Sequence, residues 1–446
     1  MFTTSSVVGR CGPCALSALL LSLWLPLPTP AQAGTARVSA LTLEHSLELS
    51  QQHSQQMAAQ EAVARAARHM AVAVGQLPDL TLKLGINNLP VTGSDQFNLT
   101  SDFMTMQSIG VMRELTRADK RKARTARFER EAEVADANRN LVQTNLQRDT
   151  ASAWLERYYL ERMRDLLGTQ RAEAALQVEA TEAAYRGARG TQADVFAARS
   201  AVALIDDRIQ QTQTLVRTAQ TRLVRWVGPE GNRALATPPD LGTVPLQMDR
   251  LEDLLEGHPQ ATLLARQEAA ARADADVAQS EQRPDWTMEL MVNQRGPAYS
   301  NMVSINFSVP LQLNQSKRQN RELFAKLALV QQMQAQREEA NQERVAQVRG
   351  WLQQWQGNRE RLLAYDRVLL PLSQQRTQAA LTAYRGNSNG TALTTVLEAR
   401  RMEIDTRMDR LRLEMETAGL WAQLNYVIAD GKSASPRATS AATRDE

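Results

Sequence analysis

The fold is decided by one uninterrupted stretch, residues 115–184, which reads LTRADKRKARTARFEREAEVADANRNLVQTNLQRDTASAWLERYYLERMRDLLGTQRAEAALQVEATEAA. It contains no proline and a single glycine, Gly168. Apolar side chains such as Leu155, Tyr159 and Met163 recur at helical spacing. A helix of about 70 residues would be roughly 105 Å long, more than a globular domain measures. The stretch therefore predicts a coiled coil or a helical tube.

A second long helix is expected over residues 316–383, with a kink at Pro371. Shorter helices are expected in pairs that lie end to end along the two long ones, because two helices of about 35 residues match roughly 105 Å. Their expected ranges are 41–74, 193–227, 248–282 and a segment after the turn at 384–390 that ends near 429.

Two strand pairs precede the long helices, over about 78–112 and 284–313. Leu82, Leu84 and Ile86 alternate with small or polar residues, as do Ile305 and Phe307, which is the pattern of strands with one apolar face. Strands of about 10 residues can cross a bilayer at a tilt. Four strands cannot close a membrane barrel, but three chains would supply 12. The alternative is a soluble sheet made of two hairpins.

The chain also carries an internal repeat of about 200 residues. The segments that repeat are Pro78-Asp79-Leu80-Thr81 with Pro284-Asp285-Trp286-Thr287, Tyr185-Arg186-Gly187 with Tyr384-Arg385-Gly386, and Ala198-Arg199 with Ala399-Arg400. We therefore expect a first repeat over 34–228, a linker over 229–247, and a second repeat over 248–429. Residues 430–446, rich in Ser and Ala, are expected to form a disordered tail.

The N-terminus predicts export. Arg10 precedes an apolar run and the small-residue cleavage pattern Ala31-Gln32-Ala33, so residues 1–33 are expected to be a cleaved secretory signal. Cys11 and Cys14 both lie within it, which would leave no thiol in the mature chain. The formal net charge of +3 gives no reason to expect a nucleic-acid partner. No phosphate loop, nucleophile elbow or metal-ligand spacing is present in the sequence, so neither an enzyme nor a cofactor is expected.

Together these features resemble TolC-type outer-membrane efflux proteins. The segments Gln76-Leu77-Pro78-Asp79, Asn87-Asn88-Leu89-Pro90-Val91 and Asp102-Phe103-Met104-Thr105-Met106 resemble the heavy-metal branch related to CzcC and CusC. The resemblance implies a mainly α-helical homotrimer, with a 12-stranded transmembrane β-barrel in the outer membrane and a long α-helical barrel in the periplasm. It also implies two partners, a periplasmic adaptor and an inner-membrane pump of the RND type.

The resemblance places the periplasmic aperture at the turns near 185 and 384. There Asp194 matches an aperture aspartate of the family and Tyr384 an aperture tyrosine. Asn389 replaces the family arginine, so Arg385 or Arg189 would have to supply its charge. Tyr185 occupies the equivalent turn of the first repeat.

Two further clusters admit more than one interpretation. A basic cluster follows the hairpins, where contact with lipid headgroups and a plain solvated helix face are both reasonable; its members are Lys120, Arg121, Lys122, Arg124, Lys317 and Arg318. Met104 and Met106 would face the same way on a strand and could bind a soft metal, although methionine in strands more often packs.

The sequence therefore predicts a passive outer-membrane duct for efflux, with heavy-metal cations as cargo. The alternatives are a duct for drug efflux or type I protein secretion and, in another class, a periplasmic coiled-coil adaptor or adhesin without a pore.

Overall fold

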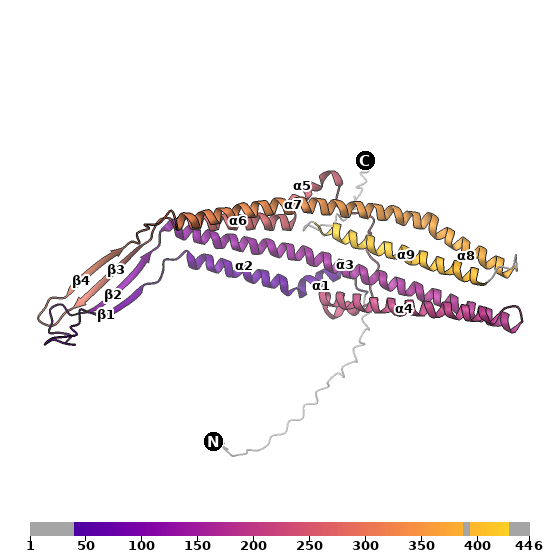
Figure 1. Cartoon of the computed structure of the whole chain (residues 1–446), viewed down its shortest axis with the longest axis horizontal. Helices are drawn as coiled ribbons and strands as arrows, with labels where there is room; N and C mark the ends of the chain where they lie inside the picture. Colours follow the sequence, from indigo (N-terminus) through magenta and orange to yellow (C-terminus); the bar gives the residue numbers. More distant parts are fainter. Residues whose placement is uncertain (1–39, 387–392, 428–446) are drawn as a thin grey trace, which may run out of the picture. The chain divides into compact units, whose positions relative to one another are not determined.

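The computed structural model describes residues 40–386 and 393–427. These residues form a set of long helices and a sheet (Figure 1). This confirms the predicted fold class, mainly helical with four antiparallel strands. The helices are α1 (Leu43–His53), α2 (Gln55–Val74), α3 (Ala118–Arg186), α4 (Gln192–Val227), α5 (Leu251–Glu256), α6 (Pro259–Ser280), α7 (Gln319–Ala364), α8 (Leu370–Arg385) and α9 (Leu393–Asn425). The strands are β1 (Thr81–Asn87), β2 (Met106–Leu115), β3 (Trp286–Gln294) and β4 (Met302–Ser308).

The shorter helices pack along α3 in two groups. α2 and α6 lie along its first part, where Arg139 pairs with Glu61 at 3.0 Å. α4 and α9 lie along its second part, where Arg171 pairs with Asp206 at 2.6 Å. Figure 1 shows the strands beyond one end of the helices and the α3–α4 turn at the opposite end. The fold thus has a sheet end and a turn end.

The largest hydrophobic core lies near the middle of α3, where the shorter helices begin or end. Trp154 is fully buried there, and its indole Nε1 donates to the backbone oxygen of Leu41 at 3.2 Å. Leu41 in turn forms a parallel bridge with Leu235, in the segment after α4. Leu223 and Leu424 complete the same cluster from α4 and α9. These contacts hold the helix ends together midway between the sheet and the turns.

Three helices differ from the sequence expectation. The segment expected over 41–74 is divided at Ser54. The hydroxyl of Ser54 accepts from the amide of Met57 and so caps the N-terminus of α2. The segment expected over 248–282 is divided before Pro259, the first residue of α6, because a residue that precedes proline disfavours the helical conformation. The second long helix contains a short π-helix, Tyr365–Leu369, directly before the expected kink at Pro371.

The four strands form one antiparallel sheet in the order β1-β2-β3-β4. The first strand pair was expected over about 78–112, but its return strand, β2, begins only at Met106 and leaves residues 88–105 without a strand. Asn98 and Asp102 explain the difference, because their side-chain oxygens accept from the amides of Thr100 and Met104. Such local turns compete with strand pairing.

None of the helices in the described ranges combines the length and apolar character needed for a bilayer span. The expected secretory signal (1–33), Asn389 and the expected tail (430–446) lie outside the described residues.

Candidate functional site

One face of the sheet is apolar and exposed. The register aligns Leu82, Val111, Leu290 and Ile305 in one row across the four strands. The next row towards the loops is also wholly apolar, and its members are Leu84, Ile109, Val292 and Val303. Leu84 is 70% exposed and Val303 is 66% exposed. No described element covers this face, although exposed apolar patches of such extent mark contact surfaces.

The opposite face is polar and hydrogen-bonded across the strands. Asn87 donates to Ser108 at 2.6 Å, and Ser108 donates to Asn293 at 2.7 Å. Asn293 donates onward to Ser304 at 2.9 Å. On the same face the Nζ of Lys83 pairs with Glu289 at 2.9 Å. A soluble sheet buries its apolar face and exposes its polar one, whereas here the polar groups are satisfied within the sheet and the apolar groups have no cover.

Arg113 is the one charged residue on the apolar face of the four described strands. It lies opposite Met288, near the sheet end of α3, and its Nε donates to the backbone oxygen of Pro78 at 2.9 Å. Arg113 is not among the residues predicted from the sequence, although the alternation of apolar residues along β2 would have placed it on that face. An arginine at this position suits the boundary between an apolar layer and water.

The first members of the basic cluster bind other parts of the chain. Lys120 Nζ lies 2.7 Å from the carboxylate of Asp285, and both side chains are largely buried. The other oxygen of Asp285 accepts from the amide of Arg117 at 3.0 Å. Arg124 lies 3.5 Å from Glu281, the residue that follows α6. Lys120 and Arg124 therefore join the start of α3 to the segment that enters β3.

Of the remaining members of the basic cluster, one binds another part of the chain and three do not. Arg121 donates to the backbone oxygen of Gly75 at 3.2 Å and so ties α3 to the end of α2. Lys122, Lys317 and Arg318 are exposed, and no ion pair joins them to any described residue. Of the six residues of the predicted basic cluster, these three therefore have no described partner and can meet an external anion.

The soft-metal hypothesis for Met104 and Met106 rested on both residues lying in one strand. The structure contradicts that premise, because Met104 belongs to the turn that precedes β2 and its amide bonds to Asp102. The described residues also contain no group of three or more His, Cys, Asp or Glu side chains that could hold a metal ion.

Backbone hydrogen bonds hold the first predicted aperture turn. The amide of Ala188 donates to the oxygen of Tyr185 at 3.0 Å, and the amide of Arg189 donates to Ala184 at 2.9 Å. Ala188 has φ of 56°, in the left-handed region that an L residue rarely adopts. Tyr185 is 48% exposed in this turn, and Arg189 is also exposed.

Asp194 has a structural partner in this turn. Its carboxylate accepts from the amide of Thr191 at 2.9 Å and from the Thr191 hydroxyl at 2.7 Å. The amide of Asp194 donates back to that hydroxyl at 3.2 Å. This reciprocal pair is a capping box that begins α4. The Thr-x-x-Asp spacing in the sequence could have revealed it.

The second predicted aperture turn begins at the end of α8. Tyr384 is half-buried and Arg385 is exposed. No hydrogen bond or ion pair joins either side chain to Tyr185, Arg189 or Asp194 in the part of the chain that the structure describes. Among the described residues, the side chains of the two predicted aperture turns are therefore not bonded to one another within a single chain.

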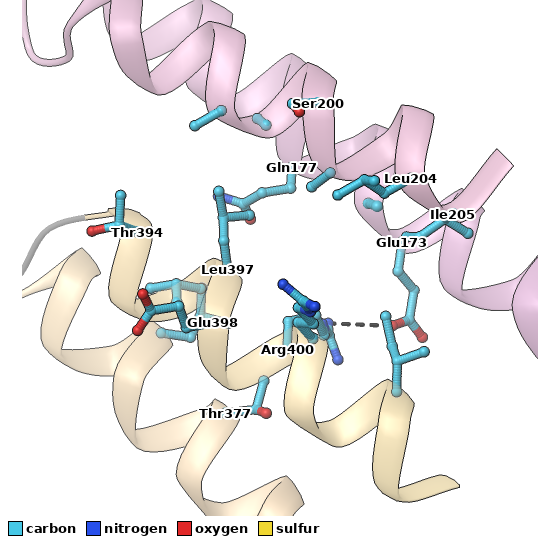
Figure 2. A pocket seen from close by; sticks show the side chains of 18 of the residues that line it. Glu173, Gln177, Ser200, Leu204, Ile205, Thr377, Thr394, Leu397, Glu398 and Arg400 are labelled. Atoms are coloured by element: carbon cyan, nitrogen blue, oxygen red, sulfur yellow. Dashed lines mark ion pairs between the residues drawn. The ribbon is translucent and has the colours of Figure 1, made fainter. Parts of the chain in front are cut away.

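A cleft of about 430 Å³ separates the α3–α4 pair from the α8–α9 pair towards the turn end. Figure 2 shows Arg400 of α9 reaching across it to Glu173 of α3, and their charged atoms are 3.2 Å apart. Arg208 of α4 pairs with Asp405 of α9 at 2.6 Å. Near the turns the two helix pairs are thus linked by charged side chains that flank an open cleft.

No protein-family model matches the chain, and no curated protein matches it. Its fold does match solved structures. The outer membrane protein VceC from Vibrio cholerae is 18% identical, with coverage of 87% of this chain and 96% of that chain and a TM-score of 0.72. The outer-membrane channel OprN is 17% identical, with coverage of 87% and 89% and a TM-score of 0.72. CusC is 15% identical, with coverage of 86% and 91% and a TM-score of 0.69. The chain therefore has the fold of outer-membrane channel proteins.

Proposed function

We propose that this protein is the outer-membrane duct of a tripartite efflux system, a passive channel and not an enzyme. The observation that carries the proposal is the sheet, whose apolar face lies uncovered while its polar face is internally hydrogen-bonded. A lipid bilayer covers the first face and a water-filled lumen meets the second. The fold it shares with outer-membrane channels supports the same location.

The sheet of one chain has two open edges, β1 and β4. Unpaired backbone groups at an edge are very costly in lipid, so a sheet there must close on itself. Three copies with four strands each form a 12-stranded barrel when β4 of one copy pairs with β1 of the next. We therefore propose a homotrimer, in which the helices of the three chains form a tube that extends into the periplasm.

The turn end of the tube faces the other components of the system. We propose that a periplasmic adaptor and an inner-membrane pump of the RND type engage this end and that the pump supplies the energy. Tyr185, Tyr384 and Asp194 would then narrow the aperture, with charge from Arg189 or Arg385.

The cargo we propose is heavy-metal cations. The support is the resemblance of the first hairpin to the heavy-metal branch of the TolC family. Drug efflux and type I secretion use the same architecture and remain the alternatives.

At the sheet end, Lys122, Lys317 and Arg318 are the cations that we propose contact lipid headgroups.

Native mass in detergent together with conductance in planar bilayers tests the duct. A trimer that conducts ions supports it. A soluble monomer without conductance rejects it and favours the periplasmic adaptor or adhesin.

Growth of a deletion strain tests the cargo. We expect sensitivity to some of copper, silver, zinc, cadmium, cobalt and nickel, and unchanged growth with organic toxicants. Sensitivity to organic compounds alone would move the protein to drug efflux.

The aperture residues are tested by single-channel conductance. Asp194→Ala and Tyr384→Phe should each raise the conductance. Thr191→Ala is the matched control, because it breaks the capping box of α4 but keeps the Asp194 carboxylate. If Thr191→Ala raises the conductance as much as Asp194→Ala, the effect arises from the helix end and the carboxylate has no role in the aperture.

A further inference from the structure

Four methionines lie on the polar face of the sheet. The strand register places Met106 and Met112 of β2, Met291 of β3 and Met302 of β4 on the same side as Ser108 and Asn293. A long apolar side chain is unexpected on a face that carries a cross-strand hydrogen-bond chain. No described helix packs on this face. Met302 is 44% exposed, and Met106, Met112 and Met291 are half-buried. A hydrophobic core shared with the helices therefore does not account for these residues.

Three of the methionines form a diagonal line across neighbouring strands. Met112 lies directly opposite Glu289, two residues before Met291. Met291 lies opposite Ser304, two residues after Met302. Diagonal neighbours of this kind have Cα atoms about 7–8 Å apart, within reach of long side chains. Both steps run in the same direction, so the line climbs from the helix end of the sheet towards the loops.

Gly110 provides the space that brings Met291 towards β2. A Cβ atom at position 110 would lie 2.6 Å from Cγ of Met291 and 2.6 Å from the backbone oxygen of Leu290. The Cγ of Met291 therefore lies close to Gly110, the one residue of β2 that has no side chain. Met112 is the next residue of β2 on the same face. The glycine thus allows the thioether of Met291 to approach that of Met112.

The donors on this surface select the kind of ion. Thioether sulfur is a soft, neutral ligand that suits Cu⁺, whereas Mg²⁺, Ca²⁺ and Mn²⁺ prefer carboxylate and carbonyl oxygen. The carboxylate directly opposite Met112 is that of Glu289, and it is already paired with Lys83 at 2.9 Å. Within the described ranges there is also no His, Cys, Asp and Glu cluster for a divalent ion.

We propose that Met112, Met291 and Met302 form a binding track for a soft monovalent cation, Cu⁺ or Ag⁺, on the water-facing surface of the sheet. The inference rests on the proposed function, because a track of this kind serves a duct whose lumen is lined by this face. It names the class of cargo, and a track with several weak positions allows the ion to enter and to leave.

Silver binding by the detergent-solubilised full-length protein tests the track. The probe is silver nitrate in a chloride-free buffer, with bound silver measured after equilibrium dialysis. The combined variant Met112→Leu, Met291→Leu and Met302→Leu keeps the volume of the side chains but removes their sulfur. We expect it to bind silver about tenfold or more weakly than the parent. Met288→Leu is the matched control, since Met288 lies on the apolar face, and it should bind as the parent does.

Two outcomes would overturn the track: equal silver binding by the parent and the combined variant, or an equal loss in Met288→Leu. Measuring potassium nitrate conductance with the same samples tests the duct independently of silver binding. If the parent conducts as a trimer but the combined variant binds silver unchanged, the track is wrong and the duct stands. If the parent neither forms trimers nor conducts, the duct is wrong, and the track loses its role even where silver binds.

Discussion

Ile305 and Asn306 are adjacent in β4, both are exposed, and they lie on opposite faces of the sheet. Ile305 belongs to the row in the middle of the apolar band, and Asn306 pairs with Glu289 on the polar face. Replacing each in turn by arginine places the same charge on the same strand, once towards the proposed lipid and once towards the proposed lumen.

The two substitutions should differ widely in cost. An arginine at the midplane of the lipid face of a membrane barrel costs about 2–4 kcal/mol, whereas a lumen position tolerates charge. Three copies would carry the substitution three times, so the closed trimer would lose about 6–12 kcal/mol if the effects add. In Asn306→Arg the new guanidinium faces Glu289, which is a favourable neighbour. We therefore expect Ile305→Arg to prevent insertion and Asn306→Arg to leave it nearly unchanged.

The assay is folding into phosphatidylcholine vesicles across a urea series, with the amount of protein in the outer-membrane fraction of cells as the second measurement. Ile305→Arg should need much less urea to unfold and should be depleted from that fraction. Equal behaviour of the two variants would refute the assignment of the faces. Better solubility of Ile305→Arg, with unchanged helical content, would favour a soluble sheet.

Two further predictions concern the joints of the helical part. Burial, with the charges of Arg344 and Arg148, lowers the pKa of His258 from 6.5 to about 4. The unfolded chain therefore takes up a proton first as pH falls, so about 3 kcal/mol of stability should be present above pH 6.5 and lost towards pH 4. Unfolding midpoints across this window should show the loss in the parent but not in His258→Asn, which can still cap α6; a parallel decline in both would exclude His258 as the cause. Asp285→Asn leaves the buried ammonium of Lys120 without its partner carboxylate, at a cost of about 3–5 kcal/mol. Its thermal midpoint should fall and should largely recover when Lys120→Met is added; an unchanged midpoint would show that the pair contributes nothing.

The sequence predicts the strands and long helices well where periodicity alone decides them. The alternation around Leu84 and Ile305 identified the apolar face, and the absence of proline before Tyr185 identified α3. Interruptions made by single side chains were missed, as at Ser54. These depend on a few local hydrogen bonds that compete with the periodic pattern.

The candidate sites were predicted less completely, because a residue type does not reveal its partner. Lys120 looked like a headgroup ligand, yet its partner Asp285 lies far along the chain and only the fold brings them together. The methionine track depends on strand register, which pairs residues from both hairpins. The register between the two hairpins cannot be read from either hairpin alone.

The strict alternation of the two faces also limits how this chain can change its length. Inserting one residue within β4 would move every later side chain of that strand to the other face, with apolar groups towards the proposed lumen and polar groups towards the proposed lipid. Inserting two residues would restore the alternation but would shift β4 relative to the rows of side chains on the neighbouring strand. Length changes are therefore tolerated in the loops 88–105 and 295–301 and not in the strands. Within the strands, many different residues satisfy the same alternation, so sequences can diverge far while strand lengths stay fixed. A fold with 15–18% identity to CusC and VceC is consistent with that constraint.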